Sequence, residues 1–226
     1  MSDCAQLYSH SKNHWEGRKK LSTFKMPSDY CQIHEKCGSC AFINKPYDKS
    51  LQKKNRQGVE IIREHVGCER ATILPPQRSP MPKGYRNTIK LAIRKAPSPR
   101  GPVGFKRRLS GLSQRFQLGL FQPGSHDIVD IRSCPLHNKS ISNLLKSLCW
   151  SLNNSKLEPW CEKTRTGDLQ YVVIRSSYPK GDLMVSFIIS RPSARPELRL
   201  ILKELQKQHP IASVYTNVKT TNDNNI

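Results

Sequence analysis

The sequence lacks several features that would place it in a familiar class. No apolar run approaches the roughly eighteen residues of a membrane span, and the first residues are polar and charged, without the apolar segment of a secretory signal. None of the 12 glycines forms a G-x-G pair, so a glycine-rich cofactor turn of that type is missing. We therefore expect a cytoplasmic protein with no membrane partner.

Acidic residues are also scarce. The chain has 17 Asp and Glu against 38 Lys and Arg, a formal net charge of +21. Self-repulsion at this charge destabilises a compact chain unless a polyanion is bound, so RNA or DNA is the first candidate partner. An anionic membrane surface fits less well, because no basic helix has bulky apolar residues on its opposite face. A basic surface that only keeps the protein soluble is the remaining alternative.

Four of the eight cysteines have a spacing that suggests a metal site. Cys31, Cys37 and Cys40 lie close together, and Cys134 follows 94 residues later, directly before Pro135. Neighbouring thiolates can meet on one face of an iron–sulfur cluster while a distant ligand completes the set. Zinc is an alternative, although its modules usually contain two close cysteine pairs. A site without metal is the third interpretation.

The other cysteines have no such spacing, and we expect them to act as small apolar residues or surface thiols. They are Cys4, Cys68, Cys149 and Cys161. Disulfides are not expected, because nothing directs the chain to an oxidising compartment.

Apolar periodicity predicts an α+β fold, a mainly antiparallel sheet with covering helices, stapled by the four-cysteine cluster. Helical spacing occurs over 48–66, 138–152 and a segment starting at Pro196, and alternation occurs over 85–95, 116–120, 127–131, 169–175, 182–189 and 211–218. We expect the helix at 48–66 to pack one face on the core. The proline-rich segment 75–84 should be an extended connector.

These elements predict four regions. They are a flexible basic arm at 1–27, the cluster loop with its helix and connector at 28–83, an antiparallel ribbon carrying Cys134 at 84–136, and an α+β portion at 137–226, which the resemblance described below assigns to a central RNA-binding domain.

Four stretches, in this order, resemble a known family. They are CQIHEKCGSC from Cys31, GYRNTIKLAI from Gly84, LGLFQPGSHDIVDIRSCPL from Leu118 and GDLQYVVIR from Gly167. Over roughly residues 28–218 the chain resembles the amino-terminal half of the RNA (uracil-5-)-methyltransferases that act on bacterial 23S rRNA and on tRNA. The resemblance implies a [4Fe-4S] cluster held by Cys31, Cys37, Cys40 and Cys134, and a central domain that grips structured RNA.

The resemblance also implies what this chain would not contain. In the family, a carboxy-terminal Rossmann-like domain binds S-adenosylmethionine and carries a cysteine nucleophile and a carboxylate base. We expect that domain to be missing, because the sequence stops at Ile226. An added OB-like domain ahead of the cluster motif, found in some members, is expected to be missing too. No residue here is therefore assigned to catalysis or to S-adenosylmethionine, and the chain is expected to be inactive alone.

The function that we expect is RNA binding by the iron–sulfur portion of a uridine-C5 methyltransferase. The residues expected to contact phosphates are Arg86, Lys90, Arg94, Lys106, Arg107 and Arg108. A structural role is expected for the cluster, with electron transfer as the alternative. Ribosomal RNA is preferred to tRNA as the partner, and we expect a monomer that would need a separately encoded catalytic half. A stand-alone iron–sulfur RNA-binding module is the alternative function.

Overall fold

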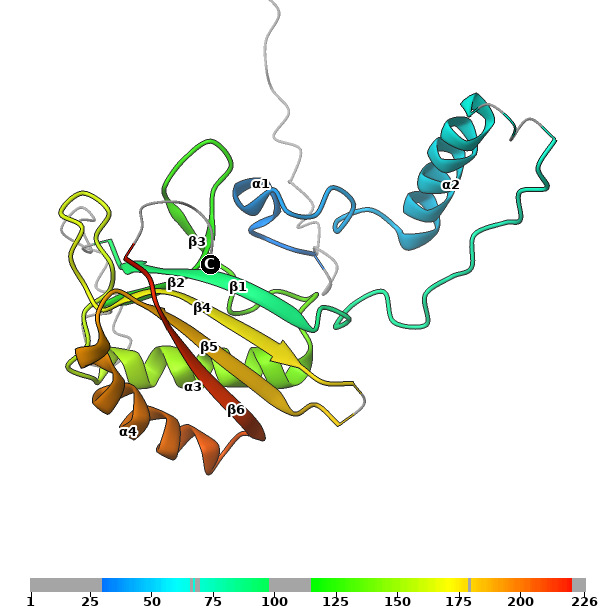
Figure 1. The fold of residues 1–226 in the computed structure, drawn as a ribbon. Coiled ribbons are helices and arrows are strands. Elements are labelled where there is room, and N and C mark those ends of the chain that lie inside the picture. Colours follow the sequence, from blue (N-terminus) through cyan, green and yellow to red (C-terminus); the bar gives the residue numbers. More distant parts are fainter. Residues whose placement is uncertain (1–29, 66, 68–69, 98–114, 179, 221–226) are drawn as a thin grey trace, which may run out of the picture.

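A six-stranded mixed sheet organises the chain in the computed structural model (Figure 1), which describes residues 30–65, 67, 70–97, 115–178 and 180–220. The strand order is β3-β2-β1-β4-β5-β6, and every neighbouring pair is antiparallel except β5 and β6. The strands are β1 (Thr88–Lys95), β2 (Phe116–Phe121), β3 (Ile128–Asp130), β4 (Leu169–Ser176), β5 (Leu183–Ile189) and β6 (Ile211–Val218). The arm expected at 1–27, together with Lys106, Arg107 and Arg108, lies outside the described residues.

The described helices differ in length and position. They are the one-turn α1 (His34–Cys37), α2 (Tyr47–Glu64), α3 (Lys139–Asn153) and α4 (Arg195–Gln206), and a 3-10 turn at Pro192–Ala194 leads into α4. The pair α3 and α4 lies against one face of the sheet (Figure 1). The α+β class with a mainly antiparallel sheet is therefore confirmed. None of the helices that the structure describes is long and apolar enough to cross a membrane.

The core lies between the sheet and these two helices. On α3, Asn138 caps the first turn by accepting a hydrogen bond from the Ser140 backbone N–H at 2.7 Å. The buried apolar stripe of this helix is Ile141, Leu144, Leu145, Leu148 and Leu152, as its spacing predicts. The buried stripe of α4 is Leu198, Ile201, Leu202 and Leu205, also as predicted. Both helices join the sheet through residues three or four positions apart, which share one helix face.

The prediction that α2 packs a face on the core is wrong. Only Ser50 is buried on this helix, while Ile61 and Ile62 are 58% and 41% exposed. Figure 1 shows α2 standing away from the sheet, connected to it by the extended chain that precedes β1. Periodicity indicates that a helix has an apolar face, but it does not indicate what that face contacts.

The start of α2 is nevertheless attached to the connector. The Ser79 backbone N–H donates to the Tyr47 hydroxyl at 2.9 Å, and Arg78 forms an ion pair with Asp48. The connector is extended, as predicted, and these contacts hold it beside the loop that carries the first three cysteines.

Candidate metal centre

The four predicted cluster ligands line one pocket. Cys31, Cys37 and Cys40 come from the loop around α1, and Cys134 comes from the turn after β3. The rest of the wall is largely apolar, and its aliphatic members are Ile33, Ile43, Leu120, Ile131 and Leu136. Two segments that are remote in the sequence thus present thiols to the same small space. This arrangement matches the three-plus-one spacing read from the sequence.

The loop before Cys40 is shaped by short-range hydrogen bonds and by a glycine. The Gly38 backbone N–H donates to the His34 carbonyl at 2.9 Å, which closes the single turn of α1. Gly38 has a φ of 65°, and a Cβ atom there would lie 2.7 Å from Pro123 Cγ in the β2–β3 turn. Glycine accommodates both the left-handed backbone and the close approach. The loop can therefore rest directly on the β2–β3 turn.

Cys31 is fixed by a side-chain clamp. Its backbone N–H donates to Asn44 Oδ1 at 2.8 Å, and Asn44 Nδ2 donates to the Cys31 carbonyl at 3.2 Å. Both main-chain polar groups of Cys31 are thus satisfied by one side chain beyond α1, which ties the two ends of the cysteine loop together.

Cys134 is held by the backbone on both sides. Its N–H donates to the Ile131 carbonyl at 3.0 Å, and its carbonyl accepts from the His137 N–H at 3.2 Å. Next along the chain, the Arg86 N–H donates to the Leu136 carbonyl at 2.8 Å. The segment before β1 therefore runs beside the segment after Cys134, which brings Arg86 to the wall of the cysteine pocket.

The thiols influence one another electrostatically. Burial raises the pKa of the Cys40 thiol, and the neighbouring Cys134, Cys37 and Cys31 raise it further, whereas Arg86 opposes the rise. His137 is buried nearby, and burial together with Arg86 lowers its pKa to about 4, so its ring is neutral at pH 7. Four thiolates in an apolar pocket need compensating positive charge, which bound metal would provide.

The four thiols are a soft donor set, which zinc and iron–sulfur clusters both use. The described residues include no group of three or more His, Cys, Asp or Glu that could hold one metal ion. Tetrahedral zinc would need all four sulfurs about 2.3 Å from one centre. A [4Fe-4S] cluster instead takes one thiolate at each of four irons, so its ligands stand further apart. The structure brings the four soft donors to one largely apolar pocket, and the cluster itself stays a prediction.

The residues predicted to bind RNA lie in different surroundings. Arg86 borders the cysteine pocket, and Lys90 is exposed on β1 with its ammonium 5.3 Å from the centroid of the Tyr171 ring. Arg94 is only 8% exposed. Its Nη1 donates to the Gln170 carbonyl at 2.9 Å, and its Nε and Nη2 donate to Glu162 at 3.1 and 2.5 Å. Because Arg94 is committed inside the protein, we leave it out of the RNA surface proposed below.

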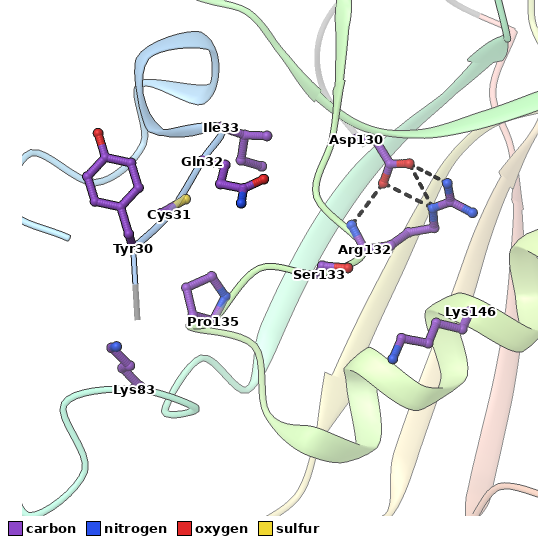
Figure 2. A pocket seen from close by; sticks show the side chains of 10 residues that line it. All are labelled: Tyr30, Cys31, Gln32, Ile33, Lys83, Asp130, Arg132, Ser133, Pro135 and Lys146. Atoms are coloured by element: carbon purple, nitrogen blue, oxygen red, sulfur yellow. Dashed lines mark hydrogen bonds and ion pairs between the residues drawn. The ribbon is translucent and has the colours of Figure 1, made fainter. Parts of the chain in front are cut away.

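A second pocket opens beside Cys31 (Figure 2). Asp130 lies within it and binds the Arg132 guanidinium through bonds of 2.8 Å to Nε and 2.5 Å to Nη2. Hydrogen bonding to Asp130 raises the pKa of Arg132, so this arginine is fixed and neutralised by its partner. Lys83 and Lys146 are the other cations of the wall. The pocket is mildly basic, but its arginine already has a carboxylate.

A third hollow was not foreseen from the sequence. It runs between the cysteine loop, the start of α2 and the connector, and it is lined by aromatic and basic side chains. Phe42 is the residue that sequence analysis missed, and its only local signal is its place two residues after Cys40. Segments that are far apart along the chain form this hollow, so no spacing rule identifies it.

The comparisons with known proteins give a consistent result, although no family model matches the chain. An uncharacterized RNA methyltransferase of Staphylococcus epidermidis is 25% identical over 86% of this chain and 39% of its own length. Another from Listeria innocua is 26% identical over 86% of this chain and 39% of its own length. A third, from Geobacter sulfurreducens, is 26% identical over 90% of this chain and 38% of its own length.

A solved structure shares the fold. The tRNA (uracil-54, C5)-methyltransferase of Pyrococcus abyssi, crystallised with S-adenosyl-L-homocysteine, superposes with a TM-score of 0.57 at 24% identity, over 86% of this chain and 40% of that one. The relatives confirm the expected resemblance to RNA methyltransferases, and the solved structure shows that the fold is shared. The chain spans about 39% of the length of the curated relatives that it matches.

Proposed function

We propose that this chain is the iron–sulfur, RNA-binding portion of an S-adenosylmethionine-dependent uridine-C5 methyltransferase that acts on structured RNA in the cytoplasm. The observation that carries the proposal is the meeting of four cysteines, from two distant segments, around one largely apolar pocket. The relatives named as RNA methyltransferases supply the enzyme class. Ribosomal RNA is the first substrate to test and tRNA the second.

Within this proposal the cluster has a structural role. Cys31, Cys37, Cys40 and Cys134 would hold it, and metal–sulfur bonds would join the loop around α1 to the turn after β3. Asn44 and Gly38 position the loop before any metal binds, because their contacts involve only the protein. The residues of this chain therefore orient the thiols, and the bound metal locks the two segments together.

RNA would be attracted by the basic surface around this centre. Arg86 lies just before β1, and Lys90 is exposed within it. Contacts of such residues with phosphates would provide affinity and register without reading the sequence. The chain covers about 39% of its relatives, so methyl transfer is proposed for the whole enzyme and no residue here is assigned to it.

Metal analysis tests the central claim. Protein purified without oxygen should contain iron and acid-labile sulfide in equal amounts, close to four of each per chain for a [4Fe-4S] cluster. Cys134→Ser should lose both, because it removes a proposed ligand. Cys161→Ser is the matched control, since Cys161 lies outside the cysteine pocket, and it should retain them. Stoichiometric zinc in the unaltered protein, or equal iron in the two variants, would refute the assignment.

A further inference from the structure

A basic groove lies next to the cysteine pocket and has the composition of a nucleic-acid site. Its volume is about 830 Å³. Four aromatic residues line it, namely Tyr30, Phe42, Tyr47 and Tyr85, together with four cations, namely Lys45, Lys54, Lys83 and Arg86. The described residues that line it include no Asp or Glu. Any anion that enters this groove would therefore meet only attractive side-chain charge.

Three lysines surround one ring at the edge of the groove. The Nζ atoms of Lys45, Lys53 and Lys54 lie 5.3, 5.7 and 5.2 Å from the centroid of the Phe42 ring. No ion pair joins these lysines to a carboxylate of the described residues. Three ammonium groups beside one ring repel one another, and binding of a polyanion would relieve that repulsion.

Elsewhere in the described chain, several arginines have carboxylate partners. Arg94 pairs with Glu162, Arg115 with Glu158, Arg132 with Asp130 and Arg191 with Asp168. The lysines around Phe42 have no such partner among the described residues, and they lie together beside one ring.

The walls of the groove are fixed before any ligand binds. The bond from Ser79 to the Tyr47 hydroxyl and the Arg78–Asp48 ion pair attach the connector to the start of α2. On the opposite side, the bond from Arg86 to Leu136 attaches the end of the connector to the segment after Cys134. Arg86, Cys40 and Leu136 line both the groove and the cysteine pocket, so the two sites share a wall.

We propose that this groove binds an unpaired stretch of RNA, with a base stacked on an exposed aromatic side chain and adjacent phosphates at Lys45 and Lys54. Tyr85 is the best candidate for stacking, because it is 53% exposed. Aromatic faces beside cations are typical of single-strand binding, where bases are free to leave the helix. The inference rests on the proposed RNA-binding function and adds to it where the RNA lies and which form of RNA is held there.

The experiment compares single-stranded with paired RNA. Fluorescence anisotropy of the full 226-residue chain would measure binding of a labelled oligouridylate and of the same strand annealed to oligoadenylate, over a series of salt concentrations. We expect the single strand to bind more tightly. Tighter or equal binding of the duplex would overturn the proposal.

Substitutions locate the bound strand. Tyr85→Leu should weaken binding of oligouridylate by about 5-fold to 150-fold if one base stacks there. Lys45→Gln combined with Lys54→Gln should lower the salt slope by about 1.4, because each phosphate contact on a single strand contributes about 0.7. Phe42→Trp keeps an aromatic ring beside Lys45 and Lys54 and should retain RNA binding. Phe42→Leu removes the ring from these lysines and should weaken RNA binding.

A matched control uses exposed lysines remote from the groove. Lys156→Gln combined with Lys203→Gln removes the same charge from the region of α3 and α4, and it should leave the slope nearly unchanged. Equal salt slopes for the two double variants would mean that RNA binds diffusely over the basic surface, which would overturn the proposal that the groove binds it. If the unaltered chain binds no RNA at low salt, the proposed function itself fails. If it binds but the groove variants behave like the unaltered chain, only this inference fails.

Discussion

At the scale of single residues, Lys90 and Arg94 are four positions apart on β1 but have different surroundings. Lys90 is exposed, whereas Arg94 is held by Glu162 and by two backbone carbonyls, those of Ile93 and Gln170. A basic residue in an alternating strand looks the same in the sequence whether its charge faces solvent or a partner. The carboxylate that binds Arg94 lies 68 residues away. Sequence alone therefore could not show that Lys90 is exposed whereas Arg94 is bound inside the protein.

Substitutions should distinguish the structural role of Arg94 from the surface role of Lys90. Arg94→Gln should lower the free energy of unfolding by about 2 to 3 kcal/mol, because the backbone carbonyls and half-exposed Glu162 lose a charged donor. Lys90→Gln should change it by less than about 0.5 kcal/mol, as is usual for a surface side chain. Urea unfolding measures both. RNA affinity of the folded protein should fall only for Lys90→Gln, and the reverse ranking would contradict these assignments.

Gly38 gives a second test at this scale. Gly38 and Gly124 both have positive φ, 65° and 71°, but only at Gly38 would a Cβ atom meet a neighbour. Each change to alanine should cost about 1 kcal/mol for the left-handed backbone. Gly38→Ala should cost more and reduce bound iron, because Pro123 must move away from the cysteine loop. Thermal unfolding and iron analysis would measure the difference between the two variants. Identical behaviour of Gly38→Ala and Gly124→Ala would mean that contact with Pro123 does not affect stability or iron binding.

At the scale of elements, the packing of α3 and α4 was predictable and the position of α2 was not. The apolar stripes of α3 and α4 extend over about three and about two turns, and they meet a sheet whose strands were also visible as alternation. On α2 a similar period is carried by fewer aliphatic residues among polar and charged ones, and the helix stands apart. Local periodicity identifies elements, whereas their partners depend on contacts between distant segments.

The contact between α3 and the end of α4 should depend on pH. His209 Nε2 lies 2.9 Å from Ser147 Oγ, and burial lowers the pKa of His209 below its ordinary value of 6.5. As pH falls below about 6.5, the unfolded chain takes up a proton that the folded chain resists, so stability decreases. His137 acts in the same direction. His209→Gln should therefore lose less stability than the unaltered protein between about pH 7 and pH 5.

Unfolding by urea at several pH values measures this effect. His65→Gln is the control, because His65 is exposed at the end of α2. The stability of His65→Gln should change with pH as that of the unaltered protein does. If the stability of His209→Gln also changes with pH in the same way, the His209–Ser147 contact does not cause the pH dependence.

At the scale of the whole molecule, the sequence predicted which cysteines would meet but not the groove beside them. Cys31, Cys37, Cys40 and Cys134 share a spacing that one cofactor can explain, so one chemical requirement linked remote segments. The groove has no comparable requirement. It arises because the connector returns past the cysteine loop, and only the folded chain shows that Phe42 and Tyr85 line the same space.

The molecule also divides into a packed body and a cysteine-bearing periphery. The buried core extends from Ile89 to Ile211, and the cysteine loop adds only partly buried contacts through Ile33 and Cys37. Loss of the proposed cluster in Cys134→Ser should therefore speed amide hydrogen exchange in the loop around α1 and in the turn after β3. Exchange in α3 and β5 should stay slow, as in Cys161→Ser. A core that folds by itself would keep its protection from exchange when the cysteine loop is released. Fast exchange throughout the sheet of Cys134→Ser would therefore mean that the metal stabilises the packed body as well.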